Sequence, residues 1–293
     1  MFEGFTARRV ATKGAEIFAR TAGSGPPLLL LHGYPQTHAI WHRVAPALAR
    51  SFTLVCADLR GYGDSAKPVS DPAHSPYSKR AMAQDMVEAM AALGFERFMV
   101  AGHDRGGRVT HRMCLDHPER VQRAAVLDIV PTRTLFRATD QALATGYYHW
   151  FFLIQPEPLP ERMIGADPLF YLHKKLGQWS GAKTTGWVAP EALAEYERCF
   201  SDPATIHASC EDYRAAATID LEHDEADLER KIACPLLVLW GERGLMHRHF
   251  DVLATWREKA SGVVEGRALA CGHYLPEEQP EATLAELRRF FAG

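Results

Sequence analysis

A chain of 293 residues is long enough for one large α/β domain with an insertion, or for two small domains. With 47% hydrophobic and 24% charged residues, its composition is that of an ordinary globular protein. The net charge of −3 gives no electrostatic reason to expect nucleic acid or an anionic membrane as a partner, so any anion bound here must be held by local cations.

The N-terminal segment MFEGFTARRV has no basic stretch followed by a long apolar one, so we do not interpret it as a signal peptide. The longest apolar runs, such as PPLLLLHG, are too short to cross a bilayer. The six cysteines are scattered and include no C-x-x-C pair, which is typical of free thiols in a reducing compartment. We therefore expect a soluble cytoplasmic protein.

The strand pattern predicts an α/β fold with a mostly parallel, eight-stranded sheet flanked by helices. Residues 7–14 and 15–23 have the pattern of an antiparallel hairpin at the sheet edge. Six runs follow that are continuously apolar, as in strands buried on both faces. They are residues 27–33, 52–59, 95–103, 123–130, 234–241 and 263–269. Helix-period segments alternate with these runs, which indicates βα units.

One of these helices is predicted over residues 79–93. It places Met82, Met86 and Met90 on one face, and Gly94 follows as a C-terminal cap. We interpret the methionines as core filling, because unbranched side chains suit irregular gaps.

The regular alternation stops after Val130. The segment that follows is rich in aromatic residues and prolines, with helical pieces and no convincing strand, until the strand pattern resumes at Cys234. We therefore predict a helical lid of residues 132–217, inserted into a core of residues 1–131 and 218–293.

The segment FMVAGHDRGG, residues 98–107, reads as a strand, a glycine-flanked turn and the start of a helix. This is the context of a nucleophile elbow, in which the usual pattern is G-x-S-x-G. The central residue here is Asp104, and glycines at 102 and 106 let neighbouring backbone pass close. We interpret Asp104 as the nucleophile; the alternative is a surface turn in which the aspartate caps the helix.

A general base and an acid that orients it are predicted from later loops. His273 lies in a Gly-His turn after the last predicted strand, which makes it the candidate base. In many proteins of this architecture the acid follows the strand at 234–241, but that loop, GERGL at residues 241–245, has glycine where an aspartate would be expected. Glu242 is nearby but out of register. Asp128 ends the strand after the elbow, so we assign it as the acid, with Glu242 as the alternative. The order nucleophile, acid, histidine is that of α/β-hydrolases.

A carboxylate nucleophile implies chemistry different from that of a serine enzyme. Aspartate attacks an sp³ carbon and forms an alkyl ester, and water activated by His273 then attacks the carbonyl of that ester. The oxyanion therefore develops on the side chain of Asp104 itself. We expect it to be stabilised by the backbone N–H of Tyr34, in the turn after the strand at 27–33, and by that of Arg105.

Arg105 follows the nucleophile directly and Arg108 lies three residues further on, so both can reach the same pocket. Their guanidinium groups suit a small carboxylate substrate, and their charge keeps Asp104 ionised. Without them, two unit charges about 4 Å apart would repel by roughly 4 kcal/mol at an effective dielectric near 20, which slows a reaction about a thousandfold. The alternative is an arginine pair on a solvated helix face.

The run G-H-D-R-G-G-R, with H-G-Y-P upstream and the late Gly-His, resembles the fluoroacetate dehalogenases of the α/β-hydrolase superfamily over essentially the whole chain. The resemblance implies hydrolysis of fluoroacetate to glycolate and fluoride, without a metal or organic cofactor, by a homodimer. Haloalkane dehalogenases typically have tryptophan directly after the nucleophile. This chain has Arg105 there, which argues against an uncharged haloalkane as substrate.

The resemblance also implies that the lid binds the halide. The histidine–tryptophan pair of the family matches His149 and Trp150, and its tyrosine matches Tyr213. Three N–H and O–H donors would stabilise the charge that develops on fluoride as the C–F bond breaks. The other interpretation is aromatic packing inside the lid. We assign Trp179 and Trp187 to packing or to the pocket wall.

A soluble epoxide hydrolase is the nearest alternative function. It would use the same triad, with two lid tyrosines protonating the epoxide oxygen; Tyr213 and either Tyr147 or Tyr148 are available. It gives no reason for two arginines beside the nucleophile. A dehalogenase of chloroacetate or larger 2-haloacids would differ only in pocket size. A ligand-sensing relative with little turnover would be expected to have lost part of the triad.

Overall fold

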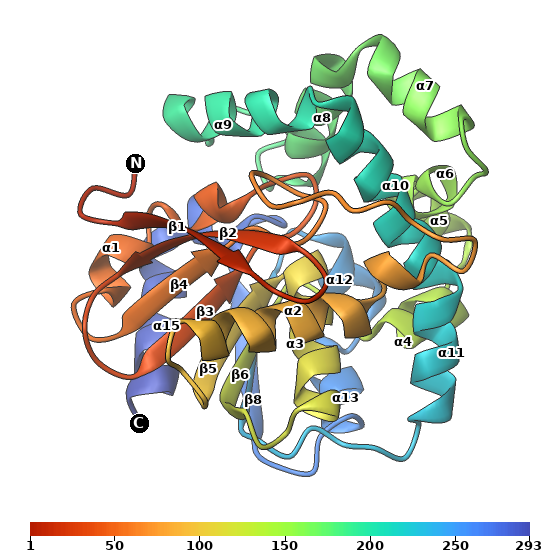
Figure 1. The fold of residues 1–293 in the computed structure, drawn as a ribbon. Helices are drawn as coiled ribbons and strands as arrows, with labels where there is room; N and C mark the ends of the chain where they lie inside the picture. The colour runs from red at the N-terminus through yellow and green to blue at the C-terminus, as the bar shows by residue number, and fades with distance from the viewer.

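In the computed structural model, which describes residues 1–293, the core is one eight-stranded sheet in the order β1-β2-β4-β3-β5-β6-β7-β8 (Figure 1). The strands are β1 (Thr6–Ala11), β2 (Glu16–Ala22), β3 (Pro27–Leu31), β4 (Thr53–Ala57), β5 (Phe98–His103), β6 (Val121–Leu127), β7 (Leu236–Gly241) and β8 (Val264–Leu269). β1 and β2 pair antiparallel, as do β2 and β4, and every other neighbouring pair is parallel. The predicted edge hairpin and mostly parallel sheet are confirmed.

Helices cover both faces of the sheet, which explains why its strands are continuously apolar. Outside the lid they are η1 (His38–Trp41), α1 (Ala45–Leu48), η2 (Ser75–Tyr77), α2 (Lys79–Ala92), α3 (Arg105–Asp116), α12 (Leu245–His249), α13 (Val252–Arg257), α14 (Leu275–Glu278) and α15 (Pro280–Ala292). In β3, Leu28 and Leu30 pack in one cluster with α1 and α15. Leu29 and Leu31 belong to a second cluster with α2, α3 and α13. Alternate residues of one strand thus enter two cores.

The helix predicted at 79–93 is α2. Met82, Met86 and Met90 are fully buried in the cluster on its side of the sheet. The helix is followed by Gly94 with a φ of +91°, the left-handed conformation that a glycine adopts after a helix end without steric cost. Both the helix and its glycine cap are confirmed.

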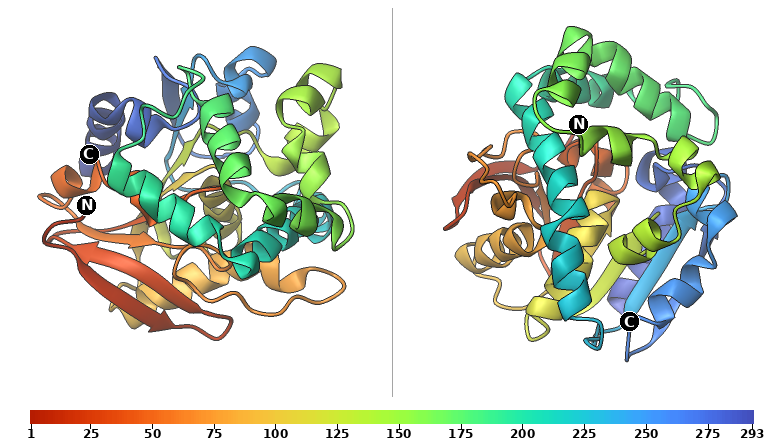
Figure 2. Two further views of the ribbon diagram at one scale, coloured as in Figure 1. Left: turned by 90° about the horizontal axis from the view of Figure 1, so that it is seen from above. Right: turned by 90° about the vertical axis from the view of Figure 1, so that its right-hand side faces the viewer.

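Eight helices and no strand lie between β6 and β7. They are α4 (Thr132–Arg137), α5 (Gln141–Gly146), α6 (His149–Leu153), α7 (Leu159–Ala166), α8 (Pro168–Trp179), α9 (Pro190–Phe200), α10 (Pro203–Ala217) and α11 (Ile219–Ala226). Figures 1 and 2 show α7 to α10 lying together over the sheet. We refer to α4–α10 as the lid. Its status as a separate domain stays a prediction, and the helical segment itself continues through α11 after residue 217.

The carboxyl ends of the parallel strands β3 to β8 lie at one edge of the sheet. The segments that follow β3, β5, β6 and β8 carry Tyr34, Asp104, Asp128 and His273 respectively. Residues that are far apart in the sequence therefore meet at this edge, as is general for ligand sites of parallel sheets. None of the helices is long and apolar enough to cross a membrane.

Candidate active site

Asp104 occupies a strained turn between β5 and α3. Its φ of +46° lies in a region that residues with a Cβ rarely adopt. The turn is tight: a Cβ at Gly102 would lie 2.2 Å from the carbonyl oxygen of Gly106, and one at Gly106 would lie 2.4 Å from that of His32. The Asp104 side chain is buried and makes no capping hydrogen bond, so the interpretation as a surface helix cap is wrong.

The backbone amide of Tyr34 contacts the nucleophile. It donates a hydrogen bond to Oδ2 of Asp104 over 2.9 Å. Gly33 permits this approach, because a Cβ there would lie 2.4 Å from Cβ of Asp104. The second predicted donor, the amide of Arg105, makes no hydrogen bond to the carboxylate. It is among the free N–H groups of the first turn of α3.

The electrostatic surroundings keep Asp104 ionised. Burial raises its pKa, but neighbouring charges outweigh burial and bring the pKa below its usual value. The neighbours that lower it are, in order of effect, His273, His103, Arg105 and Arg108. A carboxylate with these neighbours is available as a nucleophile at neutral pH.

His273 is oriented by Asp128. Its Nδ1 lies 2.6 Å from Oδ2 of Asp128, and the other oxygen of Asp128 accepts a hydrogen bond from the amide of Gly241 over 2.9 Å. Burial lowers the pKa of His273, but the hydrogen bond and charge of Asp128 raise it above the usual value. Glu242 is exposed and makes no hydrogen bond or ion pair with His273. The structure thus brings Asp128, not Glu242, to the candidate base.

Arg105 is fully buried and bound to a carboxylate of the lid. Its Nε lies 2.8 Å from Oδ2 of Asp212 and its Nη2 lies 2.7 Å from Oδ1. Its Nη1 has no hydrogen-bond partner in the protein. The guanidinium lies over the ring of Tyr213, with its Cζ 4.2 Å from the centroid. One N–H edge therefore remains available for a ligand.

Arg108 is buried as well, so the interpretation as a solvated arginine pair is wrong. Its Nη1 donates to the carbonyl of Val130 and to the hydroxyl of Thr132, each over 3.0 Å, whereas its Nε has no partner. Its Cζ lies 4.5 Å from the ring centroid of Trp150. Burial and the charge of Arg105 lower the pKa of Arg108 to about 10, so it is cationic at neutral pH.

Asp212 is a functional candidate that the sequence did not suggest. It lies on α10 beside Tyr213 and joins the elbow to the lid through Arg105. It also accepts a hydrogen bond from the hydroxyl of Tyr62 over 2.6 Å and forms an ion pair with Lys79. Burial raises the pKa of Asp212, but Arg105 and Lys79 bring it far below the usual range. Its only sequence signal is an acidic residue next to Tyr213.

The three predicted halide donors form one aromatic cluster. The ring centroids of His149 and Trp150 lie 5.4 and 5.6 Å from that of Tyr213. The hydroxyl of Tyr213 and Nδ1 of His149 have no partner in the protein. Burial lowers the pKa of His149 well below its usual value, so its imidazole is neutral. The cluster thus holds buried polar groups that are not satisfied by the protein itself.

A narrow, tightly packed pocket joins nucleophile, base and lid; its lining residues are Asp104, Tyr147, His149, Trp150, Trp179 and His273. Trp179 is therefore a wall, and its carbonyl accepts a hydrogen bond from the amide of His273 over 3.0 Å. Trp187 stacks on Tyr274 at a centroid distance of 4.6 Å, which is a packing role. No group of three or more His, Cys, Asp or Glu side chains is placed to hold a metal ion.

Comparison with known proteins places this chain in a family. Residues 26–280 match the family model of the alpha/beta hydrolase fold. The chain is 49% identical to a fluoroacetate dehalogenase from Burkholderia sp. over 100% of this chain and 95% of that protein. It is 35% identical to a soluble epoxide hydrolase from Corynebacterium sp. strain C12, over 93% and 92%.

The solved structures agree. The crystal structure described as an alpha/beta hydrolase from Nostoc sp. PCC 7120 is 60% identical, covers 99% of each chain and superimposes with a TM-score of 0.97. The predicted fold and the resemblance to the fluoroacetate dehalogenases are confirmed, and the chain is that of an enzyme. The protein belongs to the α/β-hydrolase family.

Proposed function

We propose that the protein is a hydrolytic dehalogenase of haloacetates, which converts fluoroacetate and water into glycolate and fluoride. The observation that carries this proposal is a pair of buried arginines beside a carboxylate nucleophile. Nη1 of Arg105 and Nε of Arg108 have no partner in the protein, so a substrate carboxylate can take their hydrogen bonds. The name of the Burkholderia relative, a fluoroacetate dehalogenase, supports the same activity.

In the first step, an oxygen of Asp104 attacks the carbon that bears the halogen. A C–O bond forms as the carbon–halogen bond breaks, and the halide leaves with the bonding electrons. Arg105 and Arg108 hold the substrate carboxylate and offset its repulsion from the nucleophile. The halide receives hydrogen bonds from donors of the lid, which are His149, Trp150 and Tyr213.

In the second step, His273 takes a proton from water, and the hydroxide oxygen attacks Cγ of Asp104. The amide of Tyr34 already donates to an oxygen of this carboxylate and stabilises the oxyanion. The amide of Arg105, which is free in this structure, becomes the second donor as the tetrahedral intermediate forms. Asp128 stabilises the imidazolium of His273. The ester then breaks, glycolate takes up a proton, and one proton is released per cycle. The cycle needs no metal or organic cofactor.

An epoxide hydrolase is the second candidate. The unpartnered hydroxyl of Tyr213 favours it, as does the position of Tyr147 in the cavity wall, because two lid tyrosines would protonate an epoxide oxygen. Tyr148 is 38% exposed and is not part of that wall, so Tyr147 is the better partner. The two buried arginines have no task in this reaction.

Fluoride release decides between the two. We would incubate the protein with fluoroacetate, follow free fluoride with an electrode, and run chloroacetate and styrene oxide in parallel. Asp104→Asn is the control. Fluoride release that vanishes in the variant is the expected result. Hydration of the epoxide without fluoride release would overturn the proposal and assign the lid tyrosines to acid catalysis.

The resemblance also implies an assembly. We propose a cytoplasmic homodimer, and light scattering of the purified protein tests the dimer. A mass near twice the 32.7 kDa of the chain is expected. A mass equal to that of one chain would contradict it.

A further inference from the structure

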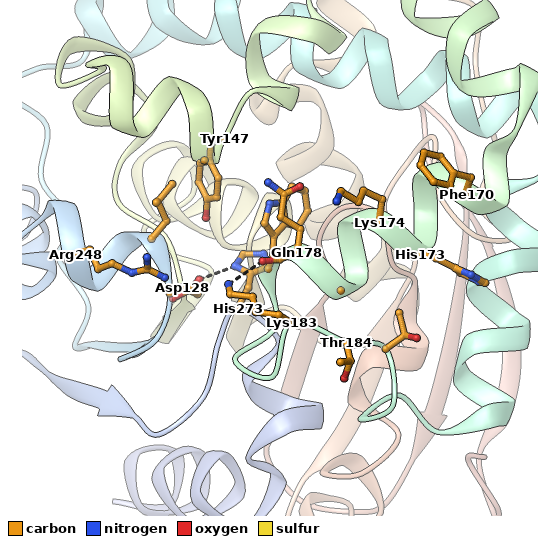
Figure 3. Close-up of a pocket in the computed structure, with 16 residues that line it drawn as sticks. Asp128, Tyr147, Phe170, His173, Lys174, Gln178, Lys183, Thr184, Arg248 and His273 are labelled. Carbon is orange, nitrogen blue, oxygen red and sulfur yellow. Dashed lines mark hydrogen bonds and ion pairs between the residues drawn. The ribbon is translucent and has the colours of Figure 1, made fainter.

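A larger cavity lies next to the catalytic one, and we call it the outer cavity (Figure 3). Its volume is about 720 Å³, and its wall comes from α5, α8, the segment after α8, and α12. It shares Tyr147, Trp179 and His273 with the small catalytic cavity. The two spaces therefore adjoin at the candidate base, and no other large cavity shares these residues.

Three cationic side chains line the outer cavity from separate segments. They are Lys174 from α8, Lys183 from the segment after α8, and Arg248 from α12. In Figure 3 their head groups extend toward the part of the cavity where Asp128 and His273 lie. Three separate chain segments thus contribute the same charge to one space.

These cations are not neutralised by carboxylates. Nζ of Lys183 donates to the carbonyl of Gln178 over 2.9 Å, and Nη2 of Arg248 donates to the carbonyl of Arg243 over 2.7 Å. Neither these two nor Lys174 forms an ion pair within the protein. Burial lowers the pKa of Lys183, and the nearby charge of Arg248 lowers it further.

The carboxylates nearby are already engaged. Asp128 is the only acidic residue in the wall, and it is bound to His273 and to a backbone amide. Glu278, whose charge also acts on Lys183, accepts hydrogen bonds from the amides of Gly181, Gly272 and Tyr274. The wall holds three cations and one carboxylate, so its formal charge is positive.

This positive charge is local. Another cavity of about 790 Å³ is lined by three carboxylates, Asp71, Glu157 and Glu211, and one arginine, Arg214. The whole chain has a net charge of −3. Of the two largest cavities, the one that reaches the candidate base is cationic, although the protein as a whole is anionic.

We propose that the outer cavity is a capture site for small carboxylate anions, from which the substrate passes by Tyr147 and Trp179 to Asp104. This inference rests on the proposed function, because it assumes an anionic substrate. Unpaired cations that line a cleft raise the local concentration of an anion, and such steering raises association rates by about 10- to 1,000-fold at low salt. A neutral epoxide would gain nothing from it.

The test is the ionic-strength dependence of kcat/KM for fluoroacetate in the triple variant K174Q/K183Q/R248Q. At low ionic strength we expect a value about tenfold below that of the wild type. The difference should vanish near about 1 M salt, where the Debye length is only about 3 Å. kcat at saturation should not change, because none of the three residues touches the reacting atoms.

A matched control changes the net charge equally elsewhere. Arg8, Arg50 and Arg97 are exposed, form no ion pair, and lie outside both the outer and the catalytic cavity. We expect R8Q/R50Q/R97Q to behave like the wild type. The single variant K183E, which reverses one charge, should lower kcat/KM at low ionic strength more than K183Q does.

The outcomes separate the two proposals. Absence of fluoride release by the wild type would overturn the proposed function itself. Fluoride release by the wild type, with equal kcat/KM and equal salt dependence in the outer-cavity and control variants, would overturn the capture site alone. The expected loss, confined to the outer-cavity variants and abolished by salt, would support it.

Discussion

Asp104 and Asp128, which the core contributes to the site, are both held by backbone conformations with positive φ, at +46° and +52°. Tyr213, which the lid contributes, lies inside the regular helix α10, and side-chain contacts alone fix its ring. Asp104 or Asp128 can move only if the backbone conformation of its turn changes. Tyr213 can shift together with the side chains that surround it. We therefore expect changes in the core to stop the reaction and changes in the lid to alter its rate and selectivity.

The largest effect is expected for His273→Gln in the core. Without the base, Asp104 can still displace the halide, but the ester is not hydrolysed. We expect one fluoride per active site, followed by turnover at least about a thousandfold slower than in the wild type. Rapid-quench fluoride assays measure the burst, and intact mass spectrometry detects the ester.

The double variant D104N/H273Q is the control, and it should show neither burst nor adduct. A single H273Q variant that turns over at the wild-type rate would show that another group activates water.

The second-largest effect is expected for Asp212, the lid residue that binds Arg105 of the core. Asp212→Asn removes the charge that pairs with buried Arg105. Breaking a buried ion pair from one side costs about 3–5 kcal/mol of stability, and a misplaced guanidinium should raise KM for haloacetates by about 10- to 100-fold. Urea denaturation and steady-state kinetics measure the two quantities.

Lys79→Met is the matched comparison. It removes the other cation bound to Asp212 and leaves the pair with Arg105 in place. We expect a loss of stability with little change in KM. Equal increases of KM in both variants would mean that Asp212 acts only through the general stability of the lid.

The same contrast explains what the sequence predicts well. The strands and α2 are visible as local patterns, because both faces of the sheet and one face of the helix are buried. Asp104 and His273 lie in turns with characteristic neighbours, and the lack of an aspartate in the loop 241–245 favours an acid elsewhere, at Asp128. Each of these signals is contained within a few residues of the group that it identifies.

The buried network of the lid has no such signal. Asp212 meets Arg105 across 107 residues and Tyr62 across 150 residues of sequence. A buried carboxylate and an exposed one look alike in a helix, and only the three-dimensional fold pairs it with cations. The missing hydrogen bond of the Arg105 amide likewise depends on the orientation of one carboxylate, which no motif specifies.

A moderate effect is expected for Tyr213→Phe in the lid. The hydroxyl has no partner in the protein, so its removal should leave the stability unchanged or raise it. We expect kcat/KM for fluoroacetate to fall about 10- to 100-fold, because fluoride is a strong hydrogen-bond acceptor and a poor leaving group. The decrease for bromoacetate should be smaller. Parallel fluoride and bromide assays make the comparison, and equal decreases would contradict halide binding by Tyr213.

The last effect concerns stability and not catalysis, and it is expected at Glu277, where the core meets the lid. This residue of α14 accepts hydrogen bonds from Nε2 of Gln36 over 2.6 Å and from the hydroxyl of Tyr196, on α9, over 3.1 Å. Burial raises the pKa of Glu277 from 4.5 to about 8. Between pH 4.5 and about 8, the folded protein therefore keeps a proton on Glu277 that the unfolded chain has lost.

The contribution of Glu277 to stability should consequently be complete below the unfolded pKa of 4.5 and be lost as the pH rises toward about 8, the pKa in the folded state. The slope is at most about 1.4 kcal/mol per pH unit. Urea denaturation of Glu277→Gln across this window should lack that contribution, since glutamine stays neutral in both states. Glu281→Gln, at an exposed position of α15, should keep the wild-type slope. If Glu277→Gln keeps it as well, the carboxyl is ionised in the folded protein, and the contact between core and lid is a charged one.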